Sequence, residues 1–171
     1  MGYVLLLGGA RSGKSDLACR LAAESGRDVT LIATATAGDA EMAERIERHR
    51  ASRPAQWRTI EEPVELEAAV TSSDEGNYVI IDCLTLWVAN LLGADVSADE
   101  VIARAGSVAA ALEDMDAAVV TNEVGLGIVP ANELARTYRD TLGAVNAAFA
   151  ARAQRALLMV AGRSLELASP R

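Results

Sequence analysis

The sequence predicts an α/β domain with a mostly parallel sheet and helices on both faces. Short apolar segments typical of buried parallel strands alternate with longer segments that carry apolar residues at helical spacing. The first apolar segment ends in a glycine-rich turn, and a later one ends in Asp82. A chain of 171 residues suits one complete core, so residues 1–171 are expected to form a single domain.

The first three expected elements are a strand, a helix and a strand. Residues 4–7, VLLL, are a short apolar run that ends in glycines, which fits a buried strand. Residues 14–25 carry apolar side chains at helical spacing, and Gly26 is a suitable C-cap. Residues 29–34, VTLIAT, form the second strand.

The middle of the chain continues this alternation. Asp39 is positioned to cap a helix over residues 40–50. Residues 56–63, QWRTIEEP, are expected to be irregular or briefly extended, and residues 64–70 to be helical. Residues 78–82, YVIID, form the third buried strand.

The C-terminal half repeats the pattern and includes a loop over residues 124–130, VGLGIVP, marked by glycine and proline. The expected elements are helices over residues 84–93, 98–114 and 131–154 and strands over residues 117–123 and 156–162. A final short strand over residues 164–168 fits an antiparallel edge of the sheet.

The composition excludes several classes of protein. A net charge of −8 argues against a nucleic-acid-binding surface. Apolar runs stay well short of the roughly 18 residues that span a bilayer, and the N-terminus has no signal-peptide pattern, so a cytoplasmic protein without a membrane span is expected. Cys19 and Cys83 have no metal-binding spacing and are expected to be buried free thiols.

The strongest local signal is GGARSGKS, which matches G-x4-G-K-[ST] between an apolar strand and a helix. Backbone N–H groups of such a loop wrap a phosphate, and the helix N-terminus adds positive charge. Lys14 then reaches the outer phosphates, and the Ser15 hydroxyl ligates Mg²⁺. The expected nucleotide contacts of the loop are Gly8, Gly9, Ala10, Arg11, Ser12, Gly13, Lys14 and Ser15.

Asp82 supplies a second part of this P-loop NTPase-like pattern. It ends a buried strand, and in parallel sheets ligands bind at the carboxyl ends of the strands. A carboxylate there holds Mg²⁺ directly or through water. The loop predicts a nucleotide but no particular reaction, because kinases, ATPases and GTPases all use it.

His49 is the only histidine of the chain and lies among arginines in residues 44–54, ERIERHRASRP. Met42, Ile46 and His49 follow helical spacing, which puts His49 on an apolar stripe. A neutral imidazole is a good nucleophile toward the α-phosphate of a nucleoside triphosphate, and attack there releases pyrophosphate and leaves a nucleotidyl-histidine. A core or capping histidine is the alternative.

The stretches GGARSGKS, LIATA, RIERHRASRPAQWRTIEEP, DCLTLWVANLL and TNEVGLGIVP follow one another over nearly the whole chain. Together they resemble the bifunctional adenosylcobinamide kinase / adenosylcobinamide-phosphate guanylyltransferase family of cobalamin biosynthesis. The resemblance implies that adenosylcobinamide is phosphorylated with ATP or GTP. GMP from GTP then passes through a guanylyl-histidine to adenosylcobinamide phosphate, which gives adenosylcobinamide-GDP and pyrophosphate.

The resemblance also implies roles for particular residues. His49 is the nucleophile that carries GMP, and residues 8–15 bind the triphosphate. Lys14 as the second catalytic residue and Ser15 and Asp82 as Mg²⁺ ligands follow from the loop and the strand end described above. Further implied nucleotide contacts are Ala33, Thr34, Ala35, Arg50, Ala51, Ser52, Arg53, Glu61 and Asp82. The family further implies a homo-oligomer, a trimer.

Several residues keep two interpretations. Glu123 either positions a metal or the substrate hydroxyl, or caps the following turn. Arg136 and Arg139 either meet phosphates or a neighbouring subunit, or lie on a solvated face. Trp57 and Trp87 are either packing residues or a platform for the corrinoid.

Two other functions also fit the phosphate-binding loop. One is a plain small-molecule kinase with a structural His49, and the other is a nucleotide-dependent switch that acts through partners. Residues 161–167, AGRSLEL, depart from the AG-x-P with which the family usually ends its last strand, which affects the C-terminal edge and any subunit contact made there.

Overall fold

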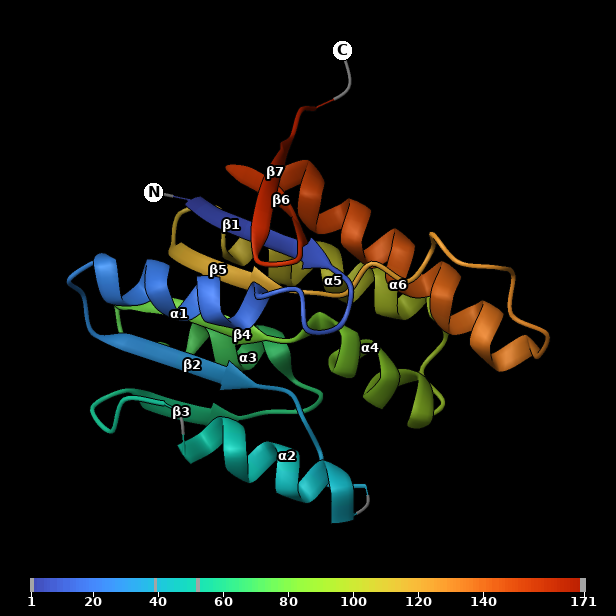
Figure 1. Cartoon of the computed structure of the whole chain (residues 1–171), viewed down its shortest axis with the longest axis horizontal. Coiled ribbons are helices and arrows are strands. Elements are labelled where there is room, and N and C mark those ends of the chain that lie inside the picture. Colours follow the sequence, from blue (N-terminus) through green and yellow to red (C-terminus); the bar gives the residue numbers. More distant parts are fainter. Residues whose placement is uncertain (1, 39, 52, 170–171) are drawn as a thin grey trace.

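The structure is built on one sheet, shown in Figure 1. This computed structural model describes residues 2–38, 40–51 and 53–169, and the side chains of Glu41, Met42, Arg45 and His49 lie outside the description. Within the described residues, seven strands form the order β3-β2-β4-β5-β1-β6-β7. All pairs are parallel except β6 and β7, which are antiparallel. The strands are β1 (Gly2–Gly8), β2 (Val29–Ala33), β3 (Arg58–Glu61), β4 (Tyr78–Asp82), β5 (Asp116–Val120), β6 (Arg155–Val160) and β7 (Arg163–Leu167).

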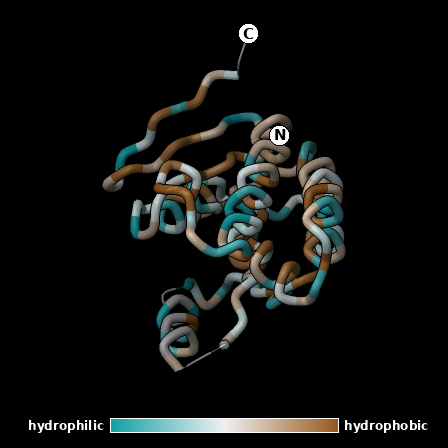
Figure 2. Tube along the Cα trace, turned by 90° about the vertical axis from the view of Figure 1, so that its right-hand side faces the viewer, coloured by the Kyte–Doolittle hydropathy of each residue, from teal (hydrophilic) through white to brown (hydrophobic). Residues whose placement is uncertain are grey.

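Helices cover the two faces of this sheet unequally. They are α1 (Lys14–Glu24), α2 (Ala40–Ala51), α3 (Leu66–Thr71), α4 (Leu84–Gly93), α5 (Ala98–Ala111) and α6 (Glu133–Arg152). Helix α1 packs on one face, whereas α3, α4, α5 and α6 gather on the other. Helix α2 lies beyond the β3 edge, apart from the other helices (Figure 2). Among the described helices, none has the length and apolar character needed to cross a membrane.

Side chains alternate along the central strands and so supply two cores. Leu5 of β1 packs with Trp87 in the core beneath α3–α6, whereas Leu6 packs in the core beneath α1. Trp87 is 1% exposed, and its indole N–H donates to a backbone carbonyl at 2.8 Å. Trp57 is partly buried against the α1 core. Both tryptophans therefore act in packing.

The strand register places several predicted site residues at one level. Val120 of β5 pairs with Leu6 of β1 on one side and with Asp82 of β4 on the other. Asp82 pairs in turn with Ala33, and Ala33 pairs with Glu61. Because these strands are parallel, their carboxyl ends meet at the same edge of the sheet.

The predicted fold is confirmed, including the antiparallel C-terminal edge strand, and the differences lie at element boundaries. Residues 58–61 form the edge strand β3, which is largely exposed and therefore has no alternating apolar pattern. The strand expected over residues 117–123 ends at Val120. The helix expected over residues 131–154 begins after Asn132, whose side chain accepts a hydrogen bond from the backbone at 2.7 Å and caps it.

Candidate functional site

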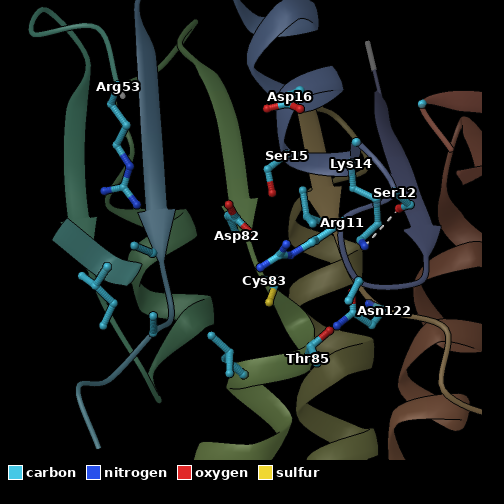
Figure 3. A pocket seen from close by; sticks show the side chains of 18 of the residues that line it. Arg11, Ser12, Lys14, Ser15, Asp16, Arg53, Asp82, Cys83, Thr85 and Asn122 are labelled. Carbon is cyan, nitrogen blue, oxygen red and sulfur yellow. Dashed lines mark hydrogen bonds between the residues drawn. The ribbon is translucent and has the colours of Figure 1, made fainter. Parts of the chain in front are cut away.

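A cavity of about 610 Å³ opens at the carboxyl edge of the sheet (Figure 3). Residues 10–16 after β1 form one wall, and the ends of β2, β4 and β5 contribute to the lining. Helix α2 and the turn between β6 and β7 also reach it through Ile46 and Gly162. This size falls within the range of about 300–1,000 Å³ that is typical of small-molecule sites.

The conformation of the loop after β1 depends on glycine. Gly8 has φ 148°, and a Cβ atom there would lie 2.3 Å from the carbonyl oxygen of Met159, so only glycine fits. Gly13 has φ 94° and immediately precedes α1. Arg11 also adopts a left-handed φ of 56°, and its side chain extends toward Cys83 in Figure 3. The N-terminus of α1 faces the same cavity and adds a partial positive charge to it.

Lys14 lies inside this loop. It is 6% exposed, and its Nζ donates to the carbonyl oxygens of Gly8 at 2.9 Å and Gly9 at 2.7 Å. A longer hydrogen bond of 3.4 Å joins the ammonium group to the Ser12 hydroxyl. The charge is therefore held at a defined position next to the backbone groups that are expected to bind phosphate.

Ser15 and Asp82 approach the cavity from α1 and from the end of β4, and Figure 3 shows their oxygen atoms turned toward one another. In the described part of the chain, no group of three or more His, Cys, Asp or Glu side chains is arranged to hold a metal ion. One hydroxyl and one carboxylate nevertheless fit Mg²⁺, because this ion usually takes few protein ligands and completes its shell with phosphate oxygens and water.

Thr34 stabilises the strand end that carries Asp82. Its hydroxyl donates to the carbonyl oxygen of Cys83 at 2.7 Å and accepts from the Cys83 N–H at 2.9 Å. Thr34 is fully buried, whereas Ala33 and Ala35 on either side line the cavity. Of these three predicted nucleotide contacts, only the two alanines have side chains at the cavity.

Arg53 and Glu61 line the cavity on the side of α2 and β3. Arg50 is exposed and forms ion pairs with Glu47, at 2.5 Å, and with Glu61. The pair with Glu47 lies within α2, whereas the pair with Glu61 links the end of α2 to the end of β3. Arg50 and the exposed Ala51 do not line the cavity, so their part in nucleotide binding stays a prediction.

The structure describes only the backbone of His49 and no part of Ser52. The backbone of His49 belongs to α2, one turn after Ile46, which lines the cavity. The His49 side chain and the whole of Ser52 lie outside the described residues. The roles expected for them, and the capping role expected for Asp39, which also lies outside, stay predictions.

Some residues of the cavity are not among the predicted site residues. Cys83, Thr85 and Asn122 follow the ends of β4 and β5 and line the cavity floor. The position of Asn122 after an apolar strand is a sequence signal for the active-site edge. Gly162 has no such signal, because the distant β6–β7 hairpin brings it to the loop. Cys19 and Cys83 are free cysteines that are partly rather than fully buried, which corrects the expected full burial. Burial, and next to it the charge of Asp82, raises the pKa of the Cys83 thiol to about 11.

Of the two interpretations left open for Glu123, Arg136 and Arg139, the structure favours local roles in each case. A carboxylate oxygen of Glu123 accepts a hydrogen bond from the Gly125 N–H at 2.5 Å, so Glu123 caps its own turn. Arg136 donates to two carbonyl oxygens before α6, at 2.8 and 3.0 Å, and Arg139 pairs with the neighbouring Asp140. None of the three lines the cavity.

Comparison with known proteins identifies relatives along nearly the full length of the chain. A family model described as cobinamide kinase / cobinamide phosphate guanyltransferase matches residues 4–167. The bifunctional adenosylcobalamin biosynthesis protein CobP of Pseudomonas aeruginosa is 49% identical over 166 residues, which cover 95% of each chain. The bifunctional adenosylcobalamin biosynthesis protein CobU of Escherichia coli is 41% identical, with 96% of this chain and 98% of that protein covered.

Solved structures with a similar fold are more distant in sequence. The RadB recombinase superposes with a TM-score of 0.54 at 17% identity, covering 92% of this chain and 73% of that one. The flagellar accessory protein FlaH of Methanocaldococcus jannaschii gives a TM-score of 0.50 at 14% identity, covering 95% and 74%. At these identities the likeness concerns the fold alone.

Proposed function

The chain belongs to the cobinamide kinase / cobinamide phosphate guanyltransferase family, and from this premise we propose how one domain carries out both reactions. It is an enzyme of adenosylcobalamin biosynthesis that phosphorylates a cobinamide and transfers a guanylyl group to the product. We assign adenosylcobinamide as the acceptor, ATP or GTP as the phosphate donor, and GTP as the GMP donor. The observation that carries this assignment is the cavity, because it joins the phosphate-binding loop to residues of α2 and β3.

In the kinase reaction, the triphosphate lies along Gly8–Ser15, with the Lys14 ammonium beside its outer phosphates. The hydroxyl oxygen of adenosylcobinamide forms a bond to the γ-phosphorus while the bond from that phosphorus to the β,γ-bridging oxygen breaks. A nucleoside diphosphate leaves, and the hydroxyl proton passes to solvent. Ser15 and Asp82 would hold Mg²⁺, which when bound offsets the negative charge of the phosphate oxygens.

In the guanylyl transfer, an imidazole nitrogen of His49 attacks the α-phosphorus of GTP and pyrophosphate leaves. A phosphate oxygen of adenosylcobinamide phosphate then attacks the same phosphorus, which frees the imidazole and gives adenosylcobinamide-GDP. Arg53 lines the cavity and is suited to stabilise the transferring phosphoryl oxygens. Two facts support this assignment: position 49 lies in α2, and Ile46 one turn earlier reaches the cavity.

The proposed function is tested with the unmodified protein. Incubation with adenosylcobinamide, GTP and Mg²⁺ is expected to give adenosylcobinamide phosphate first and adenosylcobinamide-GDP afterwards, with one pyrophosphate released per GDP product. Chromatography with mass detection follows both products, and chelation of Mg²⁺ is expected to stop both reactions. Formation of the phosphate alone would leave a plain kinase, and nucleotide hydrolysis without any cobinamide product would point to a switch.

We also propose that the enzyme is a cytoplasmic homo-oligomer, a trimer, that binds no nucleic acid. The net charge of −8 supports the last point. Two separate apolar regions support self-association. The loop patch consists of Leu126, Ile128, Val129 and Leu134, and the hairpin patch consists of Val160, Leu165 and Leu167, all exposed. A ring needs two different surfaces on each copy that bind one another, and these two patches of the described residues are our candidates for them.

Ile128→Glu and Leu165→Glu are each expected to lower the mass in light scattering from that of a trimer to that of a monomer. Ile128 is 97% exposed and Leu165 64% exposed, so neither substitution disturbs the core, while a charge in either patch opposes burial in a subunit contact. Ala103→Glu adds the same charge to an exposed position of α5 and is expected to stay trimeric. A monomeric wild-type protein, or variants that remain trimeric, would contradict this assembly.

A further inference from the structure

Asn122 lies at a position that the strand order makes special. Strand β5 is inserted between β1, which leads into the phosphate-binding loop, and β4, which ends in Asp82. Val120 pairs with Leu6 on one side and with Asp82 on the other, and Asn122 follows two residues later. Asn122 therefore comes off the sheet between the loop and the predicted magnesium ligand.

The side chain of Asn122 faces the cavity. Val120 belongs to the core beneath α1 and lines the cavity, and residues two apart in an extended segment share a face. Asn122 lines the same cavity together with Lys14, Ser15 and Asp82 (Figure 3). Four polar groups of different chemistry, an amide, an ammonium, a hydroxyl and a carboxylate, thus converge on one space.

The peptide groups of Asn122 are held firmly from two helices. Its N–H donates to the Thr85 hydroxyl at 2.8 Å, at the start of α4. Its carbonyl oxygen accepts from the Asn146 side chain of α6 at 3.0 Å, and the Asn146 oxygen accepts in turn from the Thr121 hydroxyl at 2.7 Å. Tyr138 donates to the Thr85 carbonyl oxygen at 3.2 Å and extends this network.

The side-chain amide of Asn122, in contrast, has no hydrogen-bond partner among the described residues. The other asparagines all use their side chains within the protein: Asn77, Asn90, Asn132 and Asn146. An amide that is fixed by its backbone, left unpaired and directed into a cavity with few polar groups is pre-organised to bind a ligand.

We propose that the Asn122 amide donates a hydrogen bond to the terminal phosphoryl group of the triphosphate in the kinase reaction, an inference that rests on the proposed function. The α-phosphate has to lie toward α2, where His49 is assigned to attack it. Asn122 lies on the opposite side of Asp82, next to the loop, and so meets the terminal end of the triphosphate. As the acceptor oxygen bonds to the γ-phosphorus and the bridging bond breaks, charge shifts among the phosphoryl oxygens, which an N–H donor stabilises.

Asn122→Ala removes the amide but keeps both backbone hydrogen bonds, so the fold is expected to remain stable. We expect the kcat of cobinamide phosphorylation to fall about 10- to 100-fold, whereas formation of the GMP adduct from GTP changes much less. Calorimetry with ADP and with a non-hydrolysable ATP analogue is expected to show a loss of the preference for the triphosphate. Asn122→Asp, of equal size, is expected to be worse than alanine, because it places a carboxylate against the phosphate.

The matched control is Asn77→Ala. It removes an asparagine amide just before β4, at the amino ends of the strands and away from the cavity, and is expected to leave both reactions unchanged. If the wild-type protein does not bind the triphosphate at all, the proposed function itself fails. If the wild type binds and reacts as proposed, an unchanged kinase kcat and triphosphate preference in Asn122→Ala overturn the inference. An equal loss of both reactions with a lower melting temperature also overturns it, in favour of a structural role.

Discussion

Replacing His49 with alanine is expected to abolish transfer of GMP to the protein and to leave phosphorylation of adenosylcobinamide measurable. Alanine has no nitrogen to attack the α-phosphorus, whereas the kinase reaction uses the hydroxyl of the substrate as its nucleophile. Loss of a covalent nucleophile lowers the rate by at least about 10³-fold. Alanine also has a higher helix propensity than histidine, so α2 is expected to persist.

GTP labelled in the α-phosphate makes this measurable. The wild-type protein is expected to form an acid-labile, base-stable adduct, as a phosphorus–nitrogen bond requires, and His49→Ala to form none. Glu44→Ala changes an exposed residue of the same helix and is expected to retain the adduct. An adduct in His49→Ala would remove the nucleophile assignment. An equal loss of kinase and guanylyl transfer would indicate that His49 supports the structure of α2.

The elements that the sequence predicts well are those with a strong local pattern. The strand over residues 78–82 is apolar because it is buried on both faces, and its observed bounds agree with the prediction. Strand β3 at residues 58–61 is short and largely exposed, so its sequence carries no strand pattern. It is a strand because it pairs with β2. The strand over residues 117–123 ends early, at Val120.

The residues of the candidate site likewise fall into those that a local motif predicts and those that only the fold brings together. The loop of residues 8–15 is a local motif, so its glycines and Lys14 are visible in the sequence. The strand order is a property of the whole fold, and only this order brings Asn122 between the loop and Asp82. Thr34 illustrates a finer point, because alternation along the chain sends its side chain away from the cavity while Ala33 and Ala35 face it.

Lys14→Ala is expected to abolish both reactions, because in the proposed function both use a triphosphate that is bound at this loop. The ammonium group is buried in the loop and fixed by the carbonyl oxygens of Gly8 and Gly9, and alanine leaves that position without a charge. Removing one such charge from a phosphoryl-transfer site costs about 10²- to 10³-fold or more in rate. Product formation in the coupled assay and nucleotide affinity by calorimetry measure the two losses separately.

Lys14→Arg separates charge from shape at this position. Arginine keeps the positive charge, but its planar guanidinium is larger than an ammonium and is expected to displace the two carbonyl oxygens that hold Lys14. We therefore expect Lys14→Arg to be nearly as inactive as Lys14→Ala, which would explain why lysine is kept here in a chain whose other basic residues, apart from His49, are all arginine. Arg20→Ala, an exposed position of α1, is the control and is expected to retain both reactions. An active Lys14→Arg would mean that charge alone suffices, and guanylyl transfer that survives in Lys14→Ala would mean that GTP binds outside this loop in the second reaction.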